Sequence, residues 1–282
     1  MPLSNRPADL STFRLRRRTP GSFVLVPCAK QGRSIRCQGQ LEAAAAVTLL
    51  ACPQVLYIQE QPLAIWYAWQ GKEGAFEIQL LDGPPSSPRR RMKNAGTSYI
   101  VPDFLVEMTD HRKRLMEIKP SDRLARPKVR RKLAAARQFA TKNGWTFHVV
   151  TEKELMSGHL LSNVRLLNRY RQACLDADIL DQLESQVLMA GIKLGALLST
   201  SELEDPGSQR VSVFHLLATG RLSFDPCAGP LDNETLIFPG GMTSWDPFDS
   251  VWAPNGCSTD ESGGSSANSL PTVSSPKTPS ST

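Results

Sequence analysis

Two short stretches of this sequence hold the residue types needed to cut a phosphodiester. They are Pro102-Asp103 and Glu117-Ile118-Lys119. Carboxylate oxygens bind a hard cation such as Mg²⁺, and an ammonium group stabilises the negative charge that grows on an attacked phosphate. Together these groups form a minimal set for metal-dependent cleavage of a nucleic-acid backbone, so the rest of the sequence must position them.

The residues around both stretches are typical of a β-hairpin. Apolar runs at Tyr99–Val101 and Phe104–Met108 predict strand on either side of Pro102-Asp103. Thr109–Lys113 predicts the turn, and Leu115–Lys119 predicts the returning strand. Counting along this hairpin does not place Asp103 opposite Glu117, so we expect a splayed turn at a sheet edge to bring the two together.

Strand geometry decides which of these side chains share a face. Glu117 and Lys119 point the same way, whereas Met116 and Ile118 point into the opposite core. Asp103, Glu117 and the carbonyl of Ile118 are the expected Mg²⁺ ligands, with Lys119 as the catalytic amine. The alternative is a surface strand with an ordinary salt bridge, because D…E-x-K is a short pattern.

A third carboxylate, Glu42, lies in the first turn of a helix predicted over residues 39–52. It is the only charged residue between positions 37 and 59, and the helix is apolar nearly all round until Pro53 ends it. A buried carboxylate is costly unless it is paired or binds a metal, which favours Glu42 as a further metal ligand. The alternative is a first-turn glutamate that the helix dipole stabilises.

A basic helix follows the second motif. Pro127 begins a helix predicted over 127–142, and 145–150 then forms a strand, so strand, helix and strand make a right-handed crossover. Thr151 to Glu154 matches a capping box that opens another short helix. The basic helix carries the side chains that we expect to contact DNA, namely Lys128, Arg130, Arg131 and Lys132.

Composition favours a polyanionic partner. The chain has 282 residues, a formal net charge of +6 and a pI near 9.1, with basic clusters at 6–36, 89–93 and 128–132. No apolar run approaches the length of a membrane span, and the N-terminal arginines lack the apolar stretch of a signal peptide. We therefore expect a soluble intracellular protein that does not bind membrane.

Several other chemistries are argued against. The six cysteines form no C-x-x-C pair and no histidine stands at finger spacing, which argues against zinc and against a disulfide framework. The four histidines have no evident cysteine or serine partner, and no G-x-x-x-x-G-K-[ST] loop is present. A triad hydrolase and an ATPase are therefore not indicated.

The chain divides into four predicted parts. Residues 1–36 are a basic N-terminal arm with little fixed structure apart from short strands expected at Ser22–Val26. Residues 37–158 are an α/β domain with further strands at 55–58, 63–69 and 76–81 and a loop at 83–97. Residues 159–252 hold helices at 163–173, 179–190 and 211–219 and then a pairing of 222–224 with 235–238. Three short helices with a β-hairpin predict a winged-helix-like domain. Residues 253–282 are a Ser-, Gly-, Pro- and Thr-rich tail predicted to be disordered.

These motifs resemble the PD-(D/E)xK nuclease signature, with Glu42 on a helix, Pro102-Asp103-Phe104 and Glu117-Ile118-Lys119-Pro120. More narrowly, residues 101–106, 116–121 and 126–129 resemble TnsA, the endonuclease subunit of heteromeric cut-and-paste transposases. The similarity covers residues 38–155 and continues more loosely to about 240. The longer, more basic stretch at 70–97, the arginine-rich arm and the polar tail depart from the family pattern.

The resemblance implies a fold and a function. It implies an α/β, restriction-endonuclease-like mixed sheet flanked by helices, followed by a winged-helix domain. It further implies a Mg²⁺-dependent DNA endonuclease, with Mn²⁺ substituting, in the bacterial cytoplasm at the nucleoid. Such a subunit cleaves the 5′ ends of a transposon beside a TnsB-like DDE transposase and a TnsC-like AAA+ regulator. Glu42, Asp103 and Glu117 become metal ligands and Lys119 the catalytic amine.

Two other functions stay open at this point. One is a stand-alone nuclease of the same superfamily, of the restriction or repair type. The other is a DNA-binding adaptor whose nuclease site is inactive, although the presence of Glu42, Asp103, Glu117 and Lys119 together argues against such decay.

Overall fold

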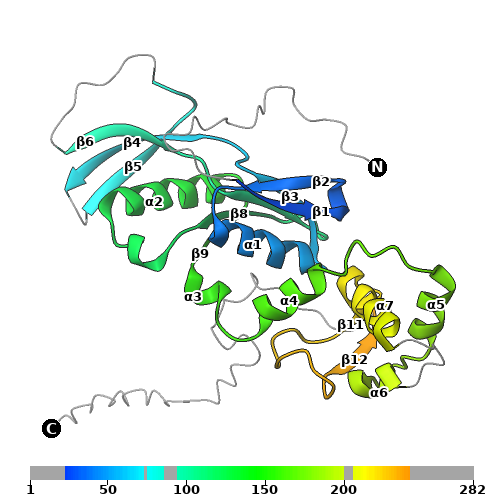
Figure 1. The fold of residues 1–282 in the computed structure, drawn as a ribbon. Helices are drawn as coiled ribbons and strands as arrows, with labels where there is room; N and C mark the ends of the chain where they lie inside the picture. The colour runs from blue at the N-terminus through cyan, green and yellow to red at the C-terminus, as the bar shows by residue number, and fades with distance from the viewer. Residues whose placement is uncertain (1–22, 73–74, 86–93, 200–205, 242–282) are drawn as a thin grey trace, which may run out of the picture.

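A computed structural model describes residues 23–72, 75–85, 94–199 and 206–241 (Figure 1). The predicted tail and the first 22 residues of the predicted arm lie outside these described residues. No helix in the described part is long and apolar enough to cross a membrane. The apolar cores fall into an N-terminal group around one mixed sheet, a smaller group that includes Ile65, Ile100 and Ala136, and a C-terminal group among helices.

The central sheet carries both motifs of interest. Its order is β3 (Val55–Glu60), β7 (Phe104–Met108), β8 (Lys113–Ile118) and β9 (Thr146–Val150). β7 runs antiparallel to both β3 and β8, whereas β9 is parallel to β8. The parallel pair needs a crossover, and α2 (Pro127–Lys142) supplies it with the bounds that the sequence predicts. The predicted mixed sheet flanked by helices is therefore confirmed.

A second sheet covers the other side of α2. It consists of β4 (Ile65–Lys72), β5 (Ala75–Leu81) and β6 (Ala95–Ile100), all antiparallel, in the order β5-β4-β6. α2 packs against all three of these strands and against β8 and β9. The loop predicted at 83–97 ends earlier than expected, because β6 already pairs with β4 from Ala95.

The predicted apolar helix is α1 (Gln40–Ala51), and it lies against the central sheet (Figure 1). Seven of its twelve residues are buried, which explains why it is apolar nearly all round. A hairpin also packs against α1. It consists of β1 (Val24–Cys28) and β2 (Arg33–Cys37), joined by the short 3₁₀ helix η1 (Ala29–Gln31). The side chains of Val26, Cys28, Ile35 and Cys37 from this hairpin are buried in the N-terminal core.

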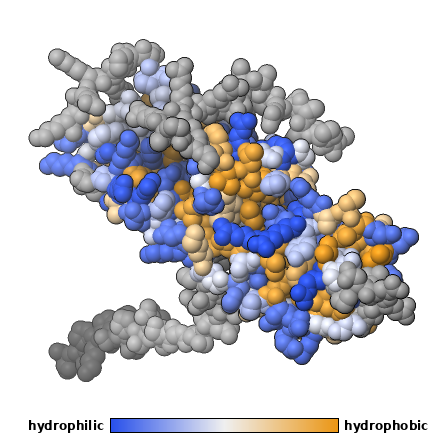
Figure 2. All heavy atoms as spheres, in the orientation of Figure 1, coloured by the Kyte–Doolittle hydropathy of each residue, from blue (hydrophilic) through white to orange (hydrophobic). Residues whose placement is uncertain are grey.

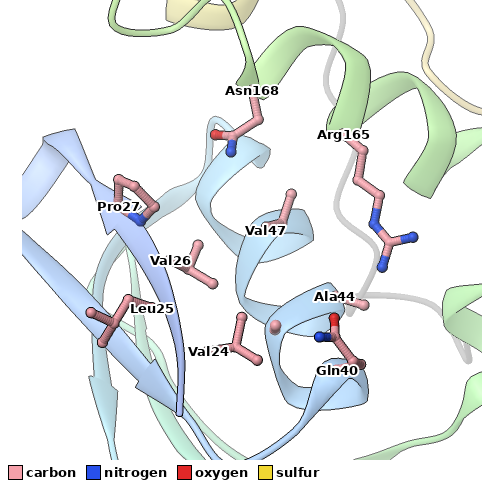
Figure 3. A pocket seen from close by; sticks show the side chains of 10 residues that line it. Val24, Leu25, Val26, Pro27, Gln40, Ala44, Val47, Arg165 and Asn168 are labelled. Carbon is pink, nitrogen blue, oxygen red and sulfur yellow. The ribbon is translucent and has the colours of Figure 1, made fainter. Parts of the chain in front are cut away.

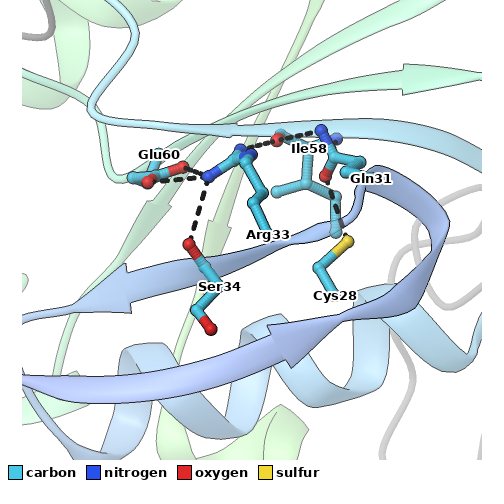
Figure 4. A network of polar contacts seen from close by, with 6 residues as sticks. All are labelled: Cys28, Gln31, Arg33, Ser34, Ile58 and Glu60. Carbon is cyan, nitrogen blue, oxygen red and sulfur yellow. Dashed lines mark hydrogen bonds and ion pairs between the residues drawn. The ribbon is translucent and has the colours of Figure 1, made fainter.

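This hairpin corrects the predicted arm, because residues 24–36 have fixed structure. A polar network ties the hairpin to β3 (Figure 4). The guanidinium of Arg33 donates to both carboxylate oxygens of Glu60 at 2.8 and 2.7 Å and to the carbonyl of Ile58 at 2.6 Å. Gln31 donates to the same carbonyl at 3.1 Å and accepts from the Cys28 thiol at 3.2 Å. Arg33 therefore serves folding as well as net charge.

Helix α4 joins the two halves of the molecule. The predicted capping box forms at Thr151 and opens α3 (Glu152–Leu155), and α4 (Leu160–Asn168) follows. Leu161 lies in the N-terminal core and Leu167 in the C-terminal core, and α4 packs against both α1 and α7. The helix predicted at 163–173 thus starts and ends earlier, and it belongs to both halves rather than to the second alone.

The C-terminal half is a small sheet with helices on one side. Its three strands are antiparallel in the order β10-β12-β11. Leu180, Leu183 and Val187 are buried as predicted, and β11 pairs with β12 as predicted. Its elements are α5 (Ala177–Ser185), β10 (Ile192–Lys193), α6 (Leu194–Ser199), α7 (Pro206–Thr219), β11 (Leu222–Ser223) and β12 (Leu236–Pro239).

One buried amide holds α4 to the loop before β12. The side chain of Asn163 donates to the carbonyls of Pro226 at 2.9 Å and Gly229 at 2.8 Å, and it accepts from the amide of Leu231 at 3.0 Å. Asn163→Ala would leave these backbone groups without partners, so we expect a loss of about 2–3 kcal/mol in the free energy of unfolding. Urea unfolding measures this, with the exposed neighbour Ser162→Ala as control. A loss under about 0.5 kcal/mol would contradict it.

Candidate active site

The hairpin register brings Asp103 to Glu117. Phe104 pairs with Met116, so the next position along each strand sets Asp103 opposite Glu117. The amide of Ile118 donates to Oδ2 of Asp103 at 2.7 Å and fixes the carboxylate there. The expectation of a splayed turn is wrong. A tight turn closed by bonds between Met108 and both His111 and Arg112 gives the register that is needed.

A buried glutamate, Glu117, pairs with the partly exposed Lys119 at the end of β8. Nζ of Lys119 lies 2.6 Å from Oε1 of Glu117, and Glu117 is only 3% exposed. Its other oxygen, Oε2, is buried and has no hydrogen-bond partner among the described residues. An exposed salt bridge on a surface strand does not describe this pair. An unsatisfied buried carboxylate oxygen is costly and is the kind of atom that a cation satisfies.

Glu42 reaches the same place from the first turn of α1. Its Oε2 accepts from the amide of Gln38 at 2.6 Å. Burial and the nearby charge of Asp103 raise the pKa of Glu42 to about 7, although Lys119 acts in the opposite direction. The Glu42 side chain is therefore poorly solvated and lies close enough to Asp103 for the two charges to interact. The helix dipole alone does not account for it.

The carboxylates repel one another in a poorly solvated space. Burial raises the pKa of Asp103, and burial with the charge of Asp103 raises the pKa of Glu117 to about 8. Burial lowers the pKa of Lys119, but the surrounding carboxylates outweigh this and keep that pKa above its ordinary value. The ammonium thus stays charged, as the sequence predicts, and one positive charge faces three acidic groups.

The donor set suits a hard divalent cation. Asp103, Glu117 and Glu42 each spend one oxygen on the protein, and Oε2 of Glu117 lacks a partner among described residues. A cation would also offset the repulsion by Asp103 that helps to raise the pKa values of Glu42 and Glu117. In the described part of the chain, no group of three or more His, Cys, Asp or Glu side chains lies close enough together to hold a metal ion by itself. Water and phosphate oxygens usually complete a Mg²⁺ shell.

A comparison with known protein families agrees with this geometry. Residues 52–152 match the family described as "TnsA-like endonuclease N terminal". Residues 52–152 are therefore similar to a TnsA-like endonuclease domain. The match contains β3 to β9 and therefore Asp103, Glu117 and Lys119, whereas Glu42 lies before it. No curated protein matches the chain.

The basic residues on α2 of the TnsA-like domain take different roles. Lys128 and Arg130 are exposed. Arg131 lies over the ring of Trp69 on β4, 3.9 Å from its centre, which is a cation–π contact. Lys132 is half-buried, and burial lowers its pKa while the carboxylate of Glu117 raises it. The four residues expected to contact DNA therefore do not form one surface.

One positioning contact of the TnsA-like domain escaped the sequence. Glu152 accepts from the amide of Ser121 at 2.9 Å and from its hydroxyl, which ties the turn after Lys119 to the start of α3. The amide of Lys119 also donates to the carbonyl of Val150 at 3.0 Å. Glu152 is visible in the sequence only as a capping-box residue, and nothing in its spacing points to Ser121.

The pKa shifts predict how the metal-free domain responds to pH. The pKa of Glu117 is higher in the folded chain than its usual value of 4.5, so its stabilising effect is present below about pH 4.5 and is lost as the pH rises through about 8. Glu117→Gln removes this loss. We expect its free energy of unfolding, relative to the parent chain, to improve by about 4 kcal/mol between pH 5 and pH 9.

Urea unfolding in EDTA at several pH values measures this difference. Glu77→Gln, an exposed carboxylate on β5, is the matched control. A pH-independent difference for Glu117→Gln would contradict the repulsion assigned to the site.

Proposed function

We propose that this chain is the Mg²⁺-dependent endonuclease subunit of a heteromeric cut-and-paste transposase. It cleaves the 5′ ends of the transposon while a DDE transposase acts at the 3′ ends and an AAA+ regulator binds the complex. The observation that carries the proposal is the convergence of Asp103, Glu117 and Lys119 through the Ile118–Asp103 bond, inside a domain of the TnsA-like family.

Each side chain has a distinct task in this proposal. Asp103, Glu117 and Glu42, with the carbonyl of Ile118, would hold the cation. When bound, Mg²⁺ would lower the pKa of a water and neutralise charge on the phosphate. The ammonium of Lys119, held by Glu117 at 2.6 Å, stabilises the charge that grows on the attacked phosphate or orients the water. Mn²⁺ is expected to replace Mg²⁺.

We assign the C-terminal half as a winged-helix domain that binds DNA or a partner. Helix, strand, two helices and two strands follow one another, and the sheet order β10-β12-β11 is the arrangement expected for that fold. The C-terminal half packs on α4, and α4 contributes residues to both cores. This shared helix sets the position of the C-terminal half relative to the nuclease sheet.

DNA binding by α2 is expected to divide according to exposure. Lys128→Ala should weaken binding to duplex DNA and reduce the slope of log K against log salt by about 1, because one phosphate contact is lost. Arg131→Ala should leave that slope unchanged and instead cost about 0.5–2 kcal/mol of folding free energy, because it loses its contact with Trp69. Fluorescence anisotropy across a salt series and urea unfolding separate the two. Equal salt slopes for both variants would contradict this division.

The direct test of the proposed function is a cleavage assay on a plasmid with the element's ends. The full chain is combined with a DDE transposase and an AAA+ regulator of the same element, in Mg²⁺, Mn²⁺, Ca²⁺ or EDTA. We expect 5′-strand cuts at the ends only in Mg²⁺ or Mn²⁺. Cutting by the chain alone, away from transposon ends, would favour a stand-alone nuclease, and no cutting with any metal would overturn the assignment.

A further inference from the structure

A groove lies between the hairpin, α1 and α4, away from the carboxylate site. It has a volume of about 370 Å³, and Figure 3 shows β1 on one side, α1 as the floor and α4 on the other side. The residues that line the groove include Leu25, Pro27, Ala44, Val47, Arg165 and Asn168.

The groove runs along the edge of β1. Four consecutive residues, 24–27, line it, so the strand turns its edge rather than one face toward the space. In the described part of the chain β1 pairs with β2 alone, and Leu25 is 60% exposed at the rim. Figure 2 shows a broad apolar area over α1 and this hairpin. Apolar surface of this kind beside an unpaired strand edge is typical of a peptide-binding site.

Arg165 gives the groove its charge preference. It is the one charged residue among those that line the groove, and its guanidinium points into the space from α4 (Figure 3). It forms no ion pair with another described residue. An occupant should therefore combine large apolar side chains with at least one carboxylate.

We propose that residues 245–252 of this same chain occupy the groove. This segment, Trp-Asp-Pro-Phe-Asp-Ser-Val-Trp, lies outside the described residues and holds four large apolar side chains, two carboxylates and no basic residue. The other terminal segment, residues 1–22, carries five arginines and one carboxylate, so Arg165 disfavours it. Composition and charge together select the C-terminal segment.

The chain is long enough to make this contact. The last described residue, Gly241, follows β12, which pairs with β11 beside α7, and α7 packs on α4. The eleven residues that follow Gly241, up to Trp252, span roughly 36 Å when extended, more than the width of a small domain. A tether of this length also gives the segment an effective concentration near the millimolar range, so weak contacts suffice.

Site-specific photocrosslinking in the full chain tests the proposal without using cleavage, so it can fail or succeed independently of the proposed function. Phe248 is replaced by a benzoylphenylalanine, the protein is irradiated, and crosslinked peptides are mapped by mass spectrometry. We expect crosslinks within one chain to residues 24–27, 40–47 or 165–168. Arg165→Glu should lower their yield about fivefold or more, and adding Asp246→Arg and Asp249→Arg should restore it.

Arg169→Glu is the matched control, since Arg169 is exposed at the end of the same helix and does not line the groove. Its crosslink yield should equal that of the parent chain. Crosslinks to other regions, or equal losses for Arg165→Glu and Arg169→Glu, would overturn the proposal. Crosslinks between two chains would assign the groove to a second copy and would overturn it as well.

Discussion

Asp103→Asn is expected to lower the rate of strand cleavage by about 10³-fold or more, because the cation loses a charged ligand at the centre of the site. Asparagine keeps the size of the side chain and can still accept from the amide of Ile118, a bond that measures 2.7 Å in the parent chain. The register between β7 and β8 should therefore survive. Single-turnover cleavage in the assembled transposase with Mg²⁺ measures the rate.

Two controls separate chemistry from folding. Glu107→Gln alters another carboxylate of β7, one that lies 3.3 Å from His111 near the hairpin turn, and it should cut at the parent rate. The Asp103→Asn protein should unfold cooperatively and bind DNA as the parent does. If it still cuts transposon ends at the parent rate, the role given to Asp103 is wrong.

Lys119→Met is expected to reduce the cleavage rate by about 10²–10³-fold while leaving DNA affinity nearly unchanged. Methionine has a similar length but no charge, so the growing charge on the phosphate loses its stabilising ammonium. Oε1 of Glu117 also loses the partner that it has at 2.6 Å, which leaves Lys132 of α2 as a cation that still acts on that carboxylate. The loss should therefore fall on the rate of chemistry and not on binding.

Lys113→Met gives the comparison on the same strand. Lys113 lies over the ring of Trp145 at 5.7 Å, at the opposite end of β8. Single-turnover rates and anisotropy titrations on both variants distinguish the roles. A Lys119→Met protein that loses DNA affinity and keeps its single-turnover rate would make Lys119 a binding residue only.

Much of the sheet could be predicted because its signals are local. Helix α2 has the predicted bounds, since Pro127 fixes its start and the apolar spacing continues to Lys142. Helix α1 and the capping box at Thr151 also follow from neighbouring residues alone. The pairing of β8 with β9 follows from their separation by one helix.

The predictions from the sequence were wrong where the structure depends on the partners of charged side chains or on the pairing of residues far apart in the sequence. Only the first strand of the β1–β2 hairpin was predicted, because the arginines of this stretch resemble a solvated arm, and only Glu60 on β3 reveals that Arg33 is an internal partner. The approach of Asp103 to Glu117 depends on the register of a hairpin turn, which residue types alone do not fix. Arg131 resembles its basic neighbours in sequence, and only the packing of β4 against α2 places it on Trp69.

The candidate site was predicted by residue type and not by geometry. The sequence names Glu42, Asp103, Glu117 and Lys119, and the structure brings all four into one electrostatic neighbourhood. The sequence cannot reveal that Oε2 of Glu117 is buried without a partner among described residues, because that burial depends on the packing of α1 and α2 around β8. The metal roles of these residues stay predictions, as do the roles of the four basic residues on α2.

The most direct test of the account is to locate Mn²⁺ by anomalous diffraction in crystals of the full chain bound to transposon-end DNA. We expect an anomalous Mn²⁺ peak in contact with Oε2 of Glu117 and the carboxylate of Asp103, and we expect this peak to be lost in Asp103→Asn crystals. A peak elsewhere, or none at Mn²⁺ concentrations that support cleavage, would contradict the claim that these carboxylates form a metal-dependent cleavage site.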